Sequence, residues 1–199
     1  MIAFNSKVKS GSSAAVVNAA LNITSKDLMI TGVPLIELSN ERAVYLMPDA
    51  GKVVVKKNRD FVFNGEIGAG KGRLNLFGKN FFFHYDEFKL DLNEIDSVQL
   101  AVPIIPIKKD MYDNEILTKV KTVIEAVTGD LRIDDPSNKS GVRTDSFPGF
   151  PIFKSFEDSY AYYDKKTIYD GVYNRDRFSF HLKPFEIDSL ASYTGKGLW

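Results

Sequence analysis

The sequence contains no cysteine, only two histidines and a single tryptophan. Without cysteine the chain forms no disulfide, holds no metal through thiolates and has no cysteine nucleophile. Its 26 basic residues are balanced by 26 acidic ones, so it lacks the general positive charge of a nucleic-acid-binding protein. It also lacks the long apolar run of a membrane span or a signal peptide. We therefore expect no nucleic-acid partner and no membrane span.

What the sequence does contain is a series of apolar pairs between Val53 and Val102. In each pair one residue separates two apolar ones, which places both on the same face of an extended strand. The pairs begin seven residues apart, at Ile67/Ala69, Leu74/Leu76, Phe81/Phe83 and Phe88/Leu90. A coiled coil would share this interval, but the interior glycines disfavour a helix by roughly 1 kcal/mol each. The pattern predicts short strands separated by turns.

Short strands at even intervals are typical of a repetitive β-solenoid-like stack or of a sandwich-like one. We favour the solenoid-like arrangement, because ordinary hairpins use longer strands at less even spacing, and keep an antiparallel β-sandwich as the alternative. One short helix near 114–128 is predicted from apolar residues at helical spacing, a capping Asp113 or Asn114 and Gly129 beyond its end. The many β-branched residues make a strand the competing interpretation there.

Two segments align without a gap, FFFHYDEFKLD (81–91) and FSFHLKPFEID (178–188), and they place His84 and His181 at the same position. These histidines could share a metal ion or could be matching surface residues of duplicated structural units. The second interpretation is favoured, because no third ligand lies at a suitable spacing. We expect one β-rich domain spanning residues 1–199, containing two related units of about 20–102 and 130–192 joined by 103–129.

Gly65–Gly72 (GEIGAGKG) comes close to the phosphate-binding loop GxxxxGK[ST]. In that motif a hydroxyl residue follows the lysine and a helix receives the phosphate. Here Gly72 replaces the hydroxyl residue and the strand-like RLNLFG follows, so we interpret the motif as a glycine-rich turn. Neither a serine elbow nor a carboxylate pair with a defined separation is identifiable. We expect no catalytic residue, no cofactor and no metal site, and hence no enzyme.

One candidate binding feature remains, a dense group of tyrosines near the C-terminal end. Its members are Tyr160, Tyr162, Tyr163, Tyr169 and Tyr173. A tyrosine ring offers an apolar face and a polar tip, so these residues, exposed together, could stack against sugars or form a surface for a partner. Strand-like alternation would place some of them in the core, and large exposed apolar patches are uncommon on soluble monomers. Both interpretations stay open.

Four stretches together carry a family resemblance: VVVKKNRDFVFNGEIGAGK, FFFHYDEFKLDLNEIDSV, LRIDDPSNKSG and YAYYDKKTIYDGVYNRDRFSFHLKPFEIDSL. They resemble segments of very large, uncharacterised β-rich bacterial proteins that are exported to the cell envelope. The resemblance covers most of residues 20–190. It implies an internal piece of a larger chain, located at the cell envelope or outside the cell, and it brings no established activity.

Taken together, these features predict a non-enzymatic structural or scaffolding β-module of a larger, envelope-associated protein. Its expected partners are other segments of that chain or other proteins. The alternative is a carbohydrate- or ligand-binding module that uses the Tyr160–Tyr173 aromatic cluster. A hydrolase that uses the acidic residues ranks last.

Overall fold

The computed structural model describes residues 2–6, 16–120, 124–125, 127–164 and 168–193. The strands are β1 (Ile2–Ser6), β2 (Val16–Leu21), β3 (Leu28–Ile30), β4 (Ile36–Ser39), β5 (Val44–Val55), β6 (Phe61–Ala69), β7 (Leu74–His84), β8 (Lys89–Pro103), β9 (Leu117–Lys119), β10 (Ile124–Glu125), β11 (Val127–Arg132), β12 (Ile152–Ser155), β13 (Ser159–Tyr162), β14 (Ser179–Leu182) and β15 (Glu186–Ile187). Short 3-10 turns are η1 (Pro136–Asn138), η2 (Thr144–Ser146), η3 (Tyr169–Gly171) and η4 (Leu190–Ser192). The prediction of a mainly β protein is confirmed.

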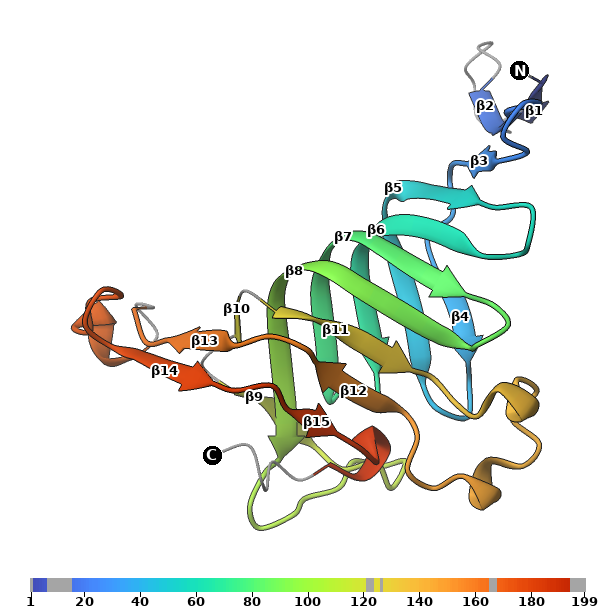
Figure 1. Ribbon diagram of the computed structural model, residues 1–199. Helices are drawn as coiled ribbons and strands as arrows, with labels where there is room; N and C mark the ends of the chain where they lie inside the picture. The colour runs from blue at the N-terminus through green and yellow to red at the C-terminus, as the bar shows by residue number, and fades with distance from the viewer. Residues whose placement is uncertain (1, 7–15, 121–123, 126, 165–167, 194–199) are drawn as a thin grey trace.

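The strands join into one open antiparallel sheet, whose main path runs β1-β2-β3-β5-β6-β7-β8-β10-β13-β14 (Figure 1). Beyond β8 the sheet divides. The first half of β8 pairs with β11, which leads to β12 and β15, whereas Val98 near its middle pairs with β10, which leads to β13 and β14. Neither the solenoid-like stack nor the sandwich is confirmed. The central strands β5 to β8 are consecutive antiparallel neighbours, and β8 alone is 15 residues long.

The long strands β5 to β8 turn sharply about halfway along their length (Figure 1). The turn coincides with a row of directly opposed residues, Pro48, Gly65, Gly78 and Ile95, next to which the register shifts in each strand pair. An extra residue in one strand of a pair bends that strand and increases its twist. The aligned bulges therefore curl the sheet around its own inner face.

The bulges also explain the sevenfold spacing of the apolar pairs. Leu74 and Phe81 both lie in β7 and both are fully buried. Their separation is an odd number of residues, so a regular strand would place them on opposite faces. Between Gly78 and Phe81, β7 has one residue more than the facing stretch of β6 from Phe63 to Gly65, and this bulge restores Phe81 to the inner face. The short strands predicted from this spacing are thus two halves of one bent strand.

The helix predicted near 114–128 is wrong. Most of its described residues belong to β9, β10 and the start of β11, and none of them is helical, while 121–123 and 126 lie outside the described residues. Each of these strands pairs with a different part of β8. The backbone of a long strand needs such hydrogen-bonding partners, and β-branched residues such as Thr118 and Val127 suit a pleated surface. Tertiary pairing therefore overrides the helical spacing.

Candidate functional site

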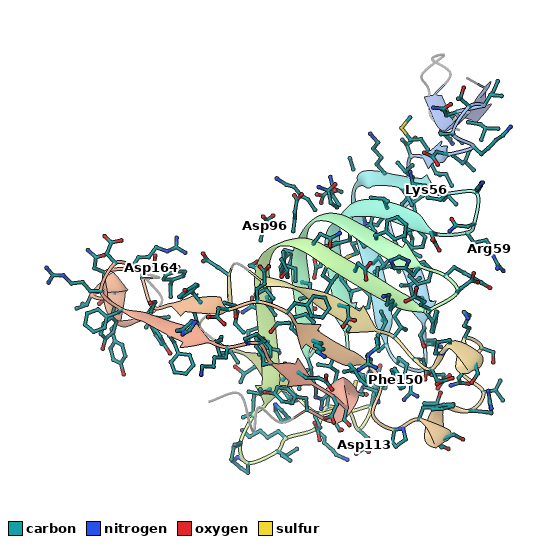
Figure 2. All side chains as sticks on the ribbon, viewed as in Figure 1. Lys56, Arg59, Asp96, Asp113, Phe150 and Asp164 are labelled. Atoms are coloured by element: carbon teal, nitrogen blue, oxygen red, sulfur yellow. The ribbon has the colours of Figure 1, made fainter. Side chains whose placement is uncertain are left out.

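The most prominent surface feature is a hairpin that projects from the body of the sheet. We call residues 156–182, which contain β13, η3 and β14, the aromatic hairpin; residues 165–167 within it are not described. It attaches through two pairs of β13 with β10, Ile124 with Ala161 and Glu125 with Tyr160. In Figure 1 it extends away from the other strands, and Asp164 marks its outer end in Figure 2.

One face of the aromatic hairpin carries a row of planar side chains. The ring of Tyr160 stacks on His181 of the opposite strand at 5.3 Å and on Tyr162 at 6.3 Å, with interplanar angles of 27° and 23°. The guanidinium of Arg175 lies 3.9 Å from the centre of the Tyr162 ring and is paired with Glu125. These groups therefore cover one another's faces, which leaves less ring surface for a flat ligand.

The tip of the hairpin carries a second aromatic group centred on Tyr173. Its ring meets Phe178 at 5.0 Å, Tyr169 at 6.1 Å and Tyr163 at 6.5 Å, each close to edge-to-face. Edge-to-face packing is a favourable geometry for aromatic pairs. The tyrosines predicted from the sequence as one cluster are thus divided between the row on the face and this group at the tip.

Six of the fifteen exposed large apolar side chains in the described part of the chain belong to this one hairpin. They are Phe156, Tyr160, Tyr169, Val172, Phe178 and Phe180. Tyr169 and Val172 are the most open, with 78% and 77% of their surfaces accessible. Such a concentration on a projecting element is typical of a contact surface.

The sequence identified the tyrosines of this surface but missed its phenylalanines. Phe178 and Phe180 alternate as Phe81 and Phe83 do, and they occupy the matching positions of the two aligned segments. In the structure residues 81–91 belong to the β7–β8 hairpin, and Phe81 and Phe83 are buried there, whereas Phe178 and Phe180 are exposed. Alternation reveals that two residues share a face, but only the neighbouring strands decide whether that face is covered.

A second exposed apolar group lies in the loop between β8 and β9, where Asp113 is labelled in Figure 2. It comprises Ile105, Ile107, Met111, Tyr112 and Ile116. Charged residues separate its members, and Lys109 and Asp113 form an ion pair of 2.8 Å across the turn. This loop is therefore a more solvated surface than the aromatic hairpin.

Of the glycine-rich segment 65–72, residues 65–69 form the end of β6 and only 70–72 lie in the turn into β7, so the interpretation as a turn is correct for its second part alone. Lys71 lines a polar cavity of about 560 Å³ together with Arg73, Lys109, Asp113 and Glu115. Arg73 is paired with Glu115, as Lys109 is with Asp113. These charges largely satisfy one another.

Each of the two histidines is paired with its own aspartate. His84 Nε2 lies 2.6 Å from Asp91, and His181 Nε2 lies 2.7 Å from Asp158. In the described residues, no group of three or more histidine and acidic side chains is arranged to hold a metal ion. The matching sequence positions therefore correspond to two separate histidine–aspartate pairs.

Asp130 on β11 lies directly opposite Asp91 on β8 and Lys154 on β12. One of its carboxylate oxygens is buried without a hydrogen bond. Burial raises the pKa of Asp130 above its ordinary value of 3.8, although the charges of Arg132, Lys89 and Lys154 act to lower it. A carboxyl group whose pKa is raised by folding destabilises the fold once it ionises.

Replacement of this carboxylate, Asp130→Asn, is expected to stabilise the protein at pH 7 by up to about 1 kcal/mol. The gain should shrink as the pH falls through the raised pKa and vanish below 3.8, where the wild-type side chain is protonated in both states. Urea denaturation midpoints of the wild type and of Asp130→Asn, at pH 7 and at pH 3.5, measure the gain in stability. Asp96→Asn, at an exposed position of β8, is the control. An equal gain at both pH values would contradict the explanation.

No family model matches the chain, and neither a curated protein nor a solved structure does. Within the described residues, no helix has the length and apolarity needed to cross a membrane.

Proposed function

We propose that the chain is a non-enzymatic structural β-module that joins a larger assembly through the aromatic hairpin. The observation that carries this proposal is the gathering of six exposed large apolar side chains on that one projecting element. The curved sheet serves as the rigid support, because its strands share a continuous core from Val44 to Leu190. In this proposal the partners are other segments of a larger protein or other proteins, at the cell envelope.

The chemistry of the hairpin supports contact with protein rather than with solvent alone. Tyrosine and phenylalanine supply large contact areas at a small cost in conformational entropy. Arg175, anchored by Glu125, adds a charged group beside the rings, and arginine is enriched at interfaces together with aromatic residues. Such residues dominate the binding energy of many protein contacts.

Photo-crosslinking from the hairpin tip tests the proposal. A benzophenone amino acid is placed at Tyr169 and, in a separate protein, at Tyr112, because the two side chains are equally exposed at 78%. Irradiation of intact cells that produce the chain should give discrete protein adducts from position 169 and far fewer from position 112. The adducts should decrease at least tenfold when Phe178→Asp is added.

Two outcomes would contradict the proposal. If position 169 gives no protein adduct, the hairpin does not contact a protein. If both positions give the same adducts, exposure alone explains them. The circular dichroism spectrum and the thermal midpoint of Phe178→Asp have to match those of the parent, so that a loss of adducts is not a loss of folding.

A carbohydrate-binding module is the second candidate, and the open Tyr169 ring at the tip favours it. A sugar stacks on a free ring face, and the faces of Tyr160 and Tyr162 are partly covered by their neighbours. In this alternative, Tyr169→Ala abolishes binding to a glycan array, while Tyr160→Ala/Tyr162→Ala has the smaller effect. Binding of a glycan without any protein adduct from position 169 would replace the first proposal with the second.

A further inference from the structure

Strand β14 (Ser179–Leu182) is the last strand of the main path, and in the described part of the chain its only strand partner is β13. Proteins usually protect such edges with charged residues, prolines, bulges or very short strands. β4 carries Glu37 and a register shift, and β15 has only two residues. β14 is short, at four residues, but it contains no lysine, acidic residue, proline or register shift, and Lys183–Pro184 comes only after its end. It can therefore accept another strand.

The apolar surface beside this edge is large enough for an association between proteins. Phe180 of β14 is 40% exposed, and Phe178, which directly precedes the strand, is 49% exposed. The ring contacts from Phe178 through Tyr173 to Tyr169 continue this surface to the tip. Tyr160 lies on the opposite face of the hairpin, beside His181. Because a large aromatic side chain buries about 150–250 Å², the other five exposed residues of the hairpin offer on the order of 500 Å². A stable interface buries about 800 Å² on each partner, so the hairpin supplies most of what a dimer needs.

We propose that two copies of the chain associate through β14, in antiparallel pairing about a twofold axis at Phe180. This inference rests on the proposed role of the hairpin as a contact surface and specifies its partner. A twofold dimer is the commonest protein assembly, and it requires a surface that is complementary to itself. Pairing two β14 edges extends the sheet across both chains.

The register centred on Phe180 is the one that this sequence favours. It places Phe180 opposite its own copy, Phe178 opposite Leu182 and Ser179 opposite His181, so apolar residues meet apolar ones on one face. Centring on Ser179 would instead set Asp176 against Leu182, a charged residue against an apolar one. In the favoured register Arg177 and Lys183 face each other just outside β14, which confines the pairing to the strand itself.

Solution mass provides the first test. Light scattering coupled to size-exclusion chromatography at about 100 μM should give twice the 22.3 kDa of a single chain. Phe180→Asp should weaken the dimer at least tenfold, whereas Val142→Asp, which introduces the same charge at an exposed position outside the aromatic hairpin, should leave it intact. A monomer at this concentration, or a dimer that Phe180→Asp does not weaken, would overturn the proposal.

The absence of cysteine permits a second test of the register that does not depend on a disruptive variant. Phe180→Cys places one thiol at the twofold axis, where two opposed Cβ atoms lie close enough for a disulfide after small adjustments. Mild oxidation should convert most of this variant to a disulfide dimer, and Val142→Cys, at a position 85% exposed elsewhere, should remain largely monomeric. Equal crosslinking of both variants would overturn the register.

The two proposals fail in different ways. A photo-adduct from position 169 with the mass of two chains supports the dimer. An adduct with a different protein, together with a monomeric mass in solution, retains the contact surface but overturns the second copy as its partner.

Discussion

Replacing Arg42 by leucine is expected to reduce the free energy of unfolding by about 3–5 kcal/mol, the usual cost of breaking a buried ion pair. Arg42 lies in the turn before β5, and its side chain is only 6% exposed. It forms two hydrogen bonds to Asp134, of 2.7 and 2.9 Å, and donates to the carbonyl oxygens of Thr144, Phe147 and Phe150. One side chain therefore ties the 134–150 segment to the sheet.

The size of the effect comes from what the substitution leaves behind. Asp134 is 1% exposed, so the substitution would leave its carboxylate in the interior without its guanidinium partner. Asn138 and the backbone N–H of Asp135 still donate to it, at 3.1 and 2.8 Å, but they carry no compensating charge. A loss of 3–5 kcal/mol is a large share of the 5–15 kcal/mol that usually stabilises a domain.

Chemical denaturation of three variants separates this explanation from a general loss of charge. Arg59→Ala, which breaks a pair whose side chains are 65% and 80% exposed, should cost less than about 1 kcal/mol. The double variant Arg42→Leu/Asp134→Leu should cost less than the sum of its single substitutions, because no buried charge is left unpaired. If Arg42→Leu costs no more than Arg59→Ala, the pair does not hold the segment in place.

The sequence could not predict this ion pair, because Arg42 and Asp134 are separated by 92 positions and neither lies in a local motif. The apolar pairs were easier to predict, since alternation is set by the geometry of a single strand. Leu74, Leu76, Phe81 and Phe83 are all buried. What alternation could not indicate is that a bulge joins the two pairs into one bent strand.

In the candidate site, too, local sequence features predicted some of the residues, and the others depend on the topology of the whole sheet. Tyr160 and Tyr169 stood out by composition, and both are exposed. Phe178 and Phe180 did not, because their pattern is that of a buried strand. Their exposure follows from the position of β14 at the end of a sheet branch, which is a property of the whole topology.

The bend of the sheet depends on glycine at two neighbouring positions of β6 and β7. Gly65 has a φ of +138°, and a Cβ atom added to it would lie 2.2 Å from the carbonyl oxygen of Met47. Gly78 has no such backbone constraint, but its Cβ would lie 2.1 Å from the carbonyl oxygen of Glu94. Both obstacles are backbone atoms of adjacent strands, so no side-chain rotation can relieve them.

We expect Gly65→Ala to reduce the free energy of unfolding by about 3–5 kcal/mol and Gly78→Ala by about 2–3 kcal/mol, because an inserted methyl group forces neighbouring strands apart. Two other glycines distinguish backbone strain from steric contact as the cause of the lost stability. Gly72 has a φ of +80° but open space around it, so Gly72→Ala measures backbone strain alone, about 1 kcal/mol. Gly149 has neither constraint, and its alanine variant should stay within about 1 kcal/mol of the parent. Urea denaturation of the four variants measures how much unfolding free energy each one loses, and so ranks them. If Gly78→Ala were as mild as Gly149→Ala, close strand approach would not maintain the bend.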